Sequence, residues 1–346
     1  MADHPFPRLY PGYLLFSLSL ARRGLSSGSL AKSGFIAAGV LGWLALANPL
    51  TLWGACLLGF YAAGSKATKV KADIKATYEE PDHAHPPSGS SPISKTSTVA
   101  SSPKTGGNRT ASQVFCNALL GTLLALTWRI LYSGELSAYS FGKGLGNWEN
   151  EGRWCVIARE EEGGRKWSRV LVFGAIAFWG ACCGDTLGIL SPSTPRLLST
   201  FRPAPRGTNG AITQFGLYIS LVGGLLVSLL AFVTLVLQGQ IGEGKCGMWA
   251  NEIGEWGWAG ELFAVGGAAG LGGSLLDSIL GFLFQPTHYS PSRKLVVHHP
   301  PSAKKYDDTI LVPGTALLGD LLSNNGVNAA STTVVTAVAM VYGLFW

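Results

Sequence analysis

Three aspartates stand in segments of the chain that are otherwise apolar. Asp185 closes the hydrophobic stretch Val170–Gly184. Asp277 lies in the middle of a second apolar stretch, and Asp320 lies in the last one. An acidic side chain near the centre of a bilayer costs about 2.5–3.5 kcal/mol. Three such positions therefore predict a polar chamber inside a helical bundle rather than three charges that face lipid.

Polar residues that suit phosphate chemistry occur at four separated places. The clusters are Gly64–Lys69; Gly106–Arg109 with Gln113 and Asn117; Gly184–Thr186 with Pro195-Arg196, Arg206–Gly210 and Thr213; and Asp277-Ser278 and Gln285 with Asp320, Asn324, Asn325 and Asn328. Lysine and arginine neutralise phosphate oxygens, which suggests this role for Lys66, Arg109, Arg196 and Arg206.

The segment Gly207-Thr208-Asn209-Gly210 comes just before an apolar helix. Glycines there let the backbone approach a ligand, and free amides at a helix start attract an anion. In isolation an ordinary turn explains the segment equally well. Together with the other clusters it favours a phosphate site.

Asp185 and Asp277 are the expected metal ligands. Mg²⁺ commonly takes one or two carboxylates and completes its shell with substrate phosphates. Phosphoryl transfer depends mainly on positioning and charge neutralisation, so carboxylates, magnesium and arginine suffice for it. Asn117, Asp320, Asn324, Asn325 and Asn328 are expected to line the chamber.

Composition points to a membrane protein. The chain has 346 residues, of which 47% are apolar and only 13% charged, and its mean hydropathy is +0.27. These values exclude an ordinary soluble domain, and they predict an all-α, polytopic bundle of about seven to eight transmembrane helices. The candidate spans are Tyr10–Leu20, Gly34–Ala47, Leu50–Gly64, Ala111–Tyr132, Val170–Leu187, Ala211–Leu237, Trp258–Phe284 and Ile310–Trp346, the last with a break at Ser323–Gly326.

The basic residues predict the orientation. Four alternate loops, Arg22–Lys32, Lys66–Arg109, Arg196–Arg206 and Arg293–Lys305, carry 3, 7, 3 and 4 of the 26 basic residues. The positive-inside rule puts these loops, and with them the site, in the cytosol. The N-terminus does not resemble a transit peptide, which favours a membrane of the endoplasmic reticulum type. A lipid bilayer is the expected partner, no nucleic acid is expected, and the oligomeric state is open.

The opposite loops are rich in tryptophan and hold two cysteines. An interfacial aromatic belt is the expected role of Trp148, Trp154, Trp167, Trp249, Trp256 and Trp258. Cys155 and Cys246 can form a disulfide if that side is oxidising.

Three regions are expected along the chain. Residues 1–80 hold N-terminal membrane helices, residues 81–107 form a disordered cytosolic linker rich in Pro, Ser and Gly, and residues 108–346 form the main bundle with the polar site.

The motifs resemble the family that includes transmembrane protein 19 and the plant phytyl-phosphate kinase. The matching stretches are Ser65–Lys69, Gln113–Asn117, Gly184–Thr186, Pro195–Thr200, Gly207–Gly210, Gly273–Ser278 and Asn324–Asn328, in the family's order. The resemblance implies a kinase that transfers phosphate from a nucleoside triphosphate, CTP in the plant member, to an isoprenyl monophosphate.

One departure from the family pattern follows Asp185-Thr186. The family continues with a segment that ends in a glutamate and a glycine, whereas here about four residues, including the glutamate, are missing. A catalytically inactive member is therefore one alternative. An ion- or proton-coupled transporter, in which Asp185, Asp277 and Asp320 relay cations, is the other.

Overall fold

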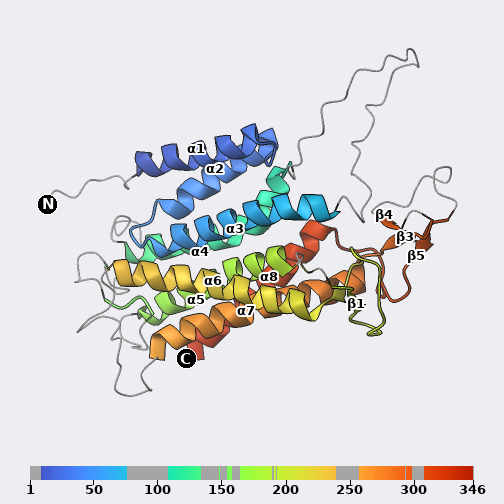
Figure 1. Cartoon of the computed structure of the whole chain (residues 1–346). Coiled ribbons are helices and arrows are strands. Elements are labelled where there is room, and N and C mark those ends of the chain that lie inside the picture. Colours follow the sequence, from blue (N-terminus) through green and yellow to red (C-terminus); the bar gives the residue numbers. More distant parts are fainter. Residues whose placement is uncertain are drawn as a thin grey trace, which may run out of the picture.

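The structure is a computed structural model that describes residues 9–75, 108–133, 148, 154–157, 164–188, 191, 193–238, 257–292, 294–297 and 308–345. Within these residues eight helices form one bundle, with short strands gathered at one end (Figure 1). The helices are α1 (Pro11–Ser26), α2 (Lys32–Leu46), α3 (Leu52–Lys75), α4 (Ala111–Tyr132), α5 (Lys166–Gly188), α6 (Gln214–Leu237), α7 (Gly257–Phe284) and α8 (Asn324–Phe345). The predicted all-α membrane architecture is confirmed.

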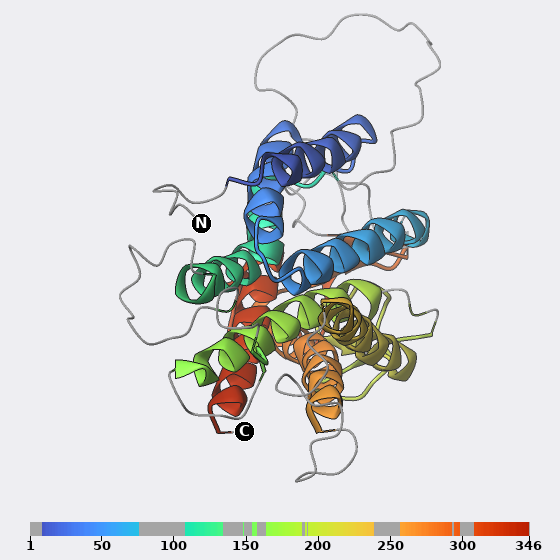
Figure 2. The ribbon, with the colours of Figure 1, turned by 90° about the vertical axis from the view of Figure 1, so that its left-hand side faces the viewer.

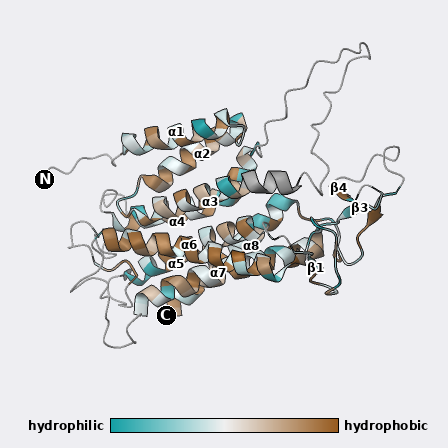
Figure 3. Ribbon diagram, viewed as in Figure 1, coloured by the Kyte–Doolittle hydropathy of each residue, from teal (hydrophilic) through white to brown (hydrophobic). Residues whose placement is uncertain are grey.

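Five helices, α4 to α8, are long and apolar enough to cross a membrane, and α2 is a shorter apolar helix. Hydrophobic residues predominate along them, and hydrophilic residues appear on α8 where it begins (Figure 3). The hydropathy pattern placed α4 at its observed ends, Ala111 and Tyr132. It ended the third span at Gly64, because the last turns of α3 are polar. The helix itself continues to Lys75.

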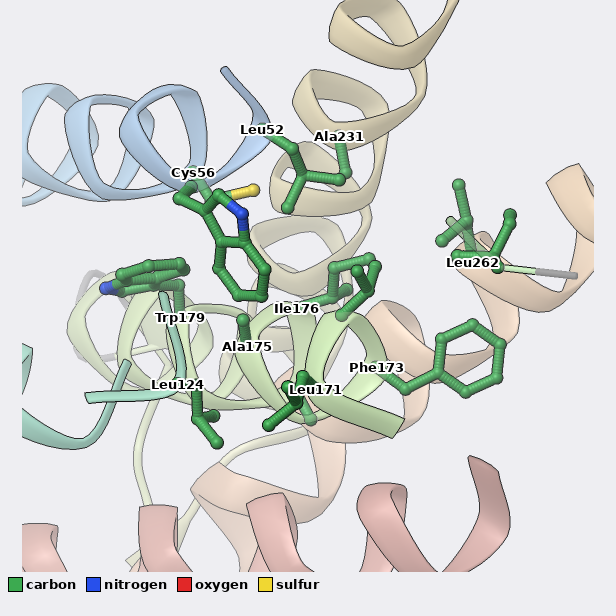
Figure 4. Close-up of a cluster of buried hydrophobic side chains, with 14 of the residues drawn as sticks. Leu52, Cys56, Leu124, Leu171, Phe173, Ala175, Ile176, Trp179, Ala231 and Leu262 are labelled. Carbon is green, nitrogen blue, oxygen red and sulfur yellow. The ribbon is translucent and has the colours of Figure 1, made fainter. Parts of the chain in front are cut away.

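Helix α5 is the centre of the bundle. Every residue from Ser168 to Gly184 is buried, since α3, α4, α6, α7 and α8 all pack around this helix. Leu171, Phe173 and Ile176 of α5 lie in the apolar core with Leu52 of α3 and Leu262 of α7 (Figure 4). A carboxylate at the end of this helix is therefore held by a rigid element.

The N-terminal helices lie to one side of the bundle (Figure 2). Helix α1 packs on α2, α2 packs on α4, and α3 packs on α5 and α6. The N-terminal helices are thus joined to the later helices by direct packing. The predicted linker at residues 81–107 lies outside the described residues.

The strands lie together at what we call the sheet end of the bundle (Figure 1). Strand β1 (Arg196–Leu197) pairs antiparallel with β2 (Ala211–Ile212), with Arg196 opposite Ile212. A second antiparallel sheet has the order β4 (Leu295–Val297), β3 (His288–Ser290) and β5 (Ile310–Leu311). Helices α3, α5 and α7 end here, and α4, α6 and α8 begin here.

The predicted span Ile310–Trp346 is wrong in its first third. Residues 310–323 form β5 and an irregular segment, and α8 begins at Asn324, within the predicted break. Gly314, Ala316 and Gly319 have positive φ angles of 88°, 53° and 100°, which a right-handed helix does not allow. Apolar content alone suggested a helix where the backbone cannot form one.

The aromatic belt is also wrong for three of its residues. Trp148, Trp154 and Trp258 are buried in protein instead of facing a membrane surface. Trp148 packs edge-on against Trp128 and donates its indole N–H to the carbonyl of Trp154 at 3.2 Å. Trp167 is 44% exposed, as a belt residue would be. Trp249 and Trp256 lie outside the described residues.

Cys155 is disulfide-bonded, whereas Cys56, Cys116, Cys182 and Cys183 are free. The remaining cysteine of the sequence, Cys246, lies outside the described residues.

Candidate functional site

Glycines bring three helices into backbone contact near the sheet end. A Cβ atom added to Gly184 of α5 would lie 2.6 Å from the carbonyl oxygen of Gly270 on α7 and 2.8 Å from that of Ser220 on α6. A Cβ at Gly224 of α6 would overlap the carbonyl oxygen of Gly266 on α7. Only residues without side chains permit this approach. The glycine-rich stretch Gly266–Gly273 of α7 is therefore a packing surface.

This contact places two of the predicted carboxylates close to one level of the bundle. A Cβ at Gly273 of α7 would lie 2.6 Å from the Cβ of Ala181 on α5. Asp185 and Asp277 follow Ala181 and Gly273 by four residues, about one helical turn, and so lie toward the same face of each helix. Both are half-buried.

Asp277 is held by α8. The hydroxyl of Ser331 donates to Asp277 Oδ1 at 3.5 Å. The side-chain amide of Asn328 is assigned with its nitrogen toward Asp277, because in this orientation it donates to Oδ1 at 3.0 Å and to the carbonyl of Asn324 at 3.1 Å. Two donors from one helix therefore meet one oxygen of a carboxylate on another, which fixes the orientation of that carboxylate.

Arg109 brings a cation toward α5. The chain around it is tied to the α1–α2 connection, because Ala31 donates its amide to the Arg109 carbonyl and Arg109 donates its own to Ser29, both at 3.0 Å. A Cβ at Gly64 would lie 4.0 Å from Arg109 Nη2 and 3.8 Å from Thr186 Cγ2. The guanidinium and the residue that follows Asp185 thus both lie close to Gly64 of α3.

Burial lowers the pKa of the Arg109 guanidinium, while the charge interaction with Tyr61 acts in the opposite direction. An arginine side chain is not deprotonated in proteins, so Arg109 keeps its charge at neutral pH. A partly buried cation of this kind favours an anion beside it.

Side-chain amides near the start of α4 make hydrogen bonds within that helix and between it and α8. Gln113 accepts the backbone N–H of Thr110 at 3.0 Å in a capping box, and Asn117 donates to the carbonyl of Gln113 at 2.9 Å. Asn325 of α8 donates to the hydroxyl of Ser112 at 3.5 Å. Asn325 therefore links α8 to the start of α4, whereas the side chain of Asn117 is bound within α4.

The Gly207–Gly210 segment packs against the end of α7. The amide of Asn209 donates to the hydroxyl of Thr287 at 2.9 Å, and its side chain donates to the carbonyl of Pro286 at 3.3 Å. The amide of Thr208 donates to Pro205. Gly210 has a φ of 75°, and a Cβ there would overlap Phe282. The amides of Thr208 and Asn209 are thus bound within the protein, so a phosphate has to use other donors in this segment.

Six predicted site residues are exposed at the sheet end: Lys66, Arg196, Arg206, Gly207, Asp320 and Asn324. Arg196 donates from Nη1 to the carbonyl of Phe201 at 3.0 Å and so braces the turn after β1. Asp320 lies in the irregular segment before α8, at the rim and not inside the bundle.

The donor set at Asp277 fits magnesium only with help from a substrate. No group of three or more His, Cys, Asp or Glu side chains that could hold a metal occurs among the described residues. Mg²⁺ needs only one or two protein carboxylates when phosphates supply further oxygens. Asp277 and Asp185 offer that number of hard oxygen ligands.

Sequence reasoning missed Ser331. A serine in an apolar helix is commonly a small packing residue, so its type carried no signal. Its spacing carried a signal, because Ser331 follows Asn328 by three residues and therefore lies on the same helix face.

Comparison with known proteins agrees with the architecture and the motif order. Residues 15–336 match the family described as integral membrane protein DUF92. Protein PGR of Arabidopsis thaliana is 30% identical over 355 aligned residues, which cover 99% of each chain. An uncharacterized membrane protein of Methanocaldococcus jannaschii, MJ0933, is 33% identical over 118 residues, or 33% of this chain and 40% of that protein. No solved structure matches. The resemblance drawn from the motifs is confirmed, and the chain belongs to the integral membrane protein DUF92 family.

Proposed function

We propose that this protein is an integral-membrane lipid-phosphate kinase. It transfers the γ-phosphoryl group of a nucleoside triphosphate to an isoprenyl monophosphate and releases the isoprenyl diphosphate and a nucleoside diphosphate. CTP is the proposed donor because the motifs resemble those of the plant phytyl-phosphate kinases. The proposed setting is a membrane of the endoplasmic reticulum type, with the sheet end toward the cytosol.

One observation carries the proposal: carboxylate and cationic side chains lie together at the sheet end of the bundle. Asp277 is oriented by Asn328 and Ser331. Asp277 and Asp185 each lie about one helical turn beyond the contact between Gly273 of α7 and Ala181 of α5. The Arg109 guanidinium and Thr186, the residue after Asp185, both lie close to Gly64 of α3. Phosphoryl transfer requires both kinds of group, because the transferring phosphate is anionic and its charge redistributes in the transition state.

The side chains have separate roles in this proposal. Arg109, Lys66 and Arg206 bind phosphate oxygens, and Gly207–Gly210 supports the nucleotide phosphates from the α7 side. Asn117, Asn324 and Asn325 hold the phosphate of the acceptor, whose apolar tail lies among the helices. An oxygen of that phosphate attacks the γ-phosphorus in line, and the bond from the γ-phosphorus to the β–γ bridging oxygen breaks. Arg196 acts at one remove, by bracing the turn that precedes the Arg206 segment.

Asp277 and Asp185 would hold magnesium, which when bound neutralises phosphate charge and orients the donor. The hydrogen bonds from Asn328 and Ser331 keep Asp277 in one orientation, so the carboxylate does not have to reorganise when phosphate binds.

The experiment is phosphate transfer by the purified protein in lipid vesicles. It is given magnesium, each of CTP, ATP, GTP and UTP, and isoprenyl monophosphates of several chain lengths. A diphosphate product identifies both substrates and supports the proposal. Bound nucleotide without product would indicate an inactive member that lacks the glutamate after Asp185. Cation flux without nucleotide, and no product, would indicate a transporter.

A further inference from the structure

Three leucines project outward just before α8. We call residues 316–322 the leucine segment. Leu317, Leu318 and Leu321 are 57%, 60% and 70% exposed. Three large apolar side chains exposed in one short segment form a patch that is suited to a partner covering apolar surface.

The leucine segment is fixed to the last turn of α7. The amides of Leu317, Leu318 and Leu321 donate to the carbonyls of Phe282, Leu283 and Phe284 at 3.3, 2.8 and 3.2 Å. The last carbonyls of a helix have no partner within the helix, and here the segment supplies one for each. Gln285 adds a bond from its side chain to the carbonyl of Leu322 at 3.3 Å. The leucines therefore project from a rigid backbone whose depth in the membrane is set by α7.

The lengths of the two neighbouring helices suit a place near the membrane surface. Helix α7 has 28 residues, about 42 Å at 1.5 Å per residue, which matches a bilayer of about 40–45 Å with its headgroups. Helix α8 has 22 residues, about 33 Å, which matches a hydrocarbon core of about 30 Å. The leucine segment joins the headgroup end of α7 to the hydrocarbon edge of α8. Such a place suits the boundary between headgroups and acyl chains.

Basic residues flank the same turn of α7. Gly210 packs against Phe282, whose carbonyl accepts the Leu317 amide, and the segment that leads to Gly210 exposes Arg202 and Arg206. Leucines inserted in a leaflet with arginines beside the headgroups are typical of an interfacial membrane segment. We infer that the leucine segment inserts into the bilayer leaflet at the sheet end and forms the lipid-facing rim of the candidate site.

The first experiment measures depth and does not depend on any enzymatic activity. An environment-sensitive fluorophore is attached to Leu318→Cys in phosphatidylcholine vesicles that carry a doxyl quencher high on the acyl chain. Ile310→Cys is the matched control, because Ile310 is also apolar and 52% exposed but lies on strand β5. Unsubstituted protein corrects for labelling of the native cysteines.

The fluorophore at residue 318 is expected to emit at shorter wavelength and to be quenched several-fold more than the one at residue 310. Equal quenching at both positions would overturn the inference. A blue shift at 318 without quenching would also overturn it, because protein and not lipid would then cover the leucines.

A second experiment rests on the proposed function and asks whether the rim admits lipid substrate. Leu317, Leu318 and Leu321 are changed together to Asn, with Ile310→Asn and Leu311→Asn as the control. The triple variant is expected to raise KM for a long-chain isoprenyl phosphate several-fold and to leave KM for a short, water-soluble one unchanged. An equal effect on both acceptors would contradict the rim's role. No transfer by the unsubstituted protein would count against the proposed function and leave the depth result standing.

Discussion

At the scale of single residues, the central feature is a carboxylate that a neighbouring helix holds in place. Asp277 Oδ1 accepts from Asn328 at 3.0 Å and from Ser331 at 3.5 Å. Placing an aspartate in a bilayer costs free energy. Donors that fix its orientation reduce that cost and select one geometry. An oriented carboxylate of this kind is what the proposed magnesium role requires.

The change Asn328→Leu keeps the size of the side chain and removes its hydrogen bond. A hydrogen bond to a charged group contributes about 1.5–3 kcal/mol, so turnover is expected to fall roughly tenfold to a hundredfold. Ser331→Ala is expected to cost less, because its bond is longer. Both are measured as initial rates of phosphate transfer in vesicles.

Ser228→Ala is the matched control for Ser331→Ala. Ser228 is a buried serine of α6 that donates to the carbonyl of Leu262 at 2.6 Å, away from the candidate site. Its substitution is expected to leave the rate unchanged. Equal losses in the two serine variants would show that the effect is structural.

Sequence found Asp277 and Asn328 because their types are out of place in apolar helices. It found Arg109 because phosphate chemistry needs a cation. It could not find that the Thr208 amide donates to Pro205 and the Asn209 amide to Thr287, since those partners depend on how the loop folds against α7. Residue type shows which groups could bind a ligand. Only the fold shows which of them already have hydrogen-bond partners within the protein.

At the scale of helices, glycines set the distance between α5, α6 and α7. Gly224→Ala is expected to destabilise the bundle by about 1–3 kcal/mol, because the new methyl group overlaps the Gly266 carbonyl and the helices have to separate. The measurement is the midpoint of thermal unfolding in detergent. Gly272→Ala is the matched control, since a Cβ at Gly272 has nothing within 4 Å. An unchanged midpoint for Gly224→Ala would contradict the packing role.

The β3–β4 turn is expected to loosen in acid. Hydrogen bonds from the side chain and amide of Ser292, and from the hydroxyl of Ser290, hold the pKa of the exposed Asp308 carboxyl below its usual range. A lowered pKa means that this contribution is present above the ordinary value of about 3.9 and is lost as pH falls through the folded value. Hydrogen exchange at the Ser292 amide, corrected for the intrinsic pH dependence, is expected to rise below about pH 4. In Asp308→Asn the corrected rate is expected to show no such rise.

Hydropathy located most helices within a few residues and failed at residues 310–323. Strand β5 and the leucine segment are as apolar as a span, and periodicity cannot separate an interfacial segment from a transmembrane one. Positive φ angles at Gly314, Ala316 and Gly319 decide the matter in the fold. The buried tryptophans mislead in the same way, because an aromatic ring suits a protein core as well as a membrane surface.

At the scale of the whole molecule, the account requires the two ends of the bundle to face different compartments. Gly152→Thr completes a glycosylation sequon that begins at Asn150, in the connection between α4 and α5. Gly89→Asn creates one in the connection between α3, which ends at the sheet end, and α4, which begins there. In glycosylating microsomes the first variant is expected to gain a glycan and the second to gain none, read as a shift in mobility that a glycosidase removes. The reverse pattern would contradict a cytosolic site.

The most direct test of the central claim compares Asp277→Asn with Asp308→Asn in the phosphate-transfer assay. Both changes remove one carboxylate, but Asp277 lies in the candidate site and Asp308 lies in the turn beyond the sheet. The account expects Asp277→Asn to abolish diphosphate formation with little change in folded yield, and Asp308→Asn to keep the unsubstituted rate. Full activity in Asp277→Asn would contradict it.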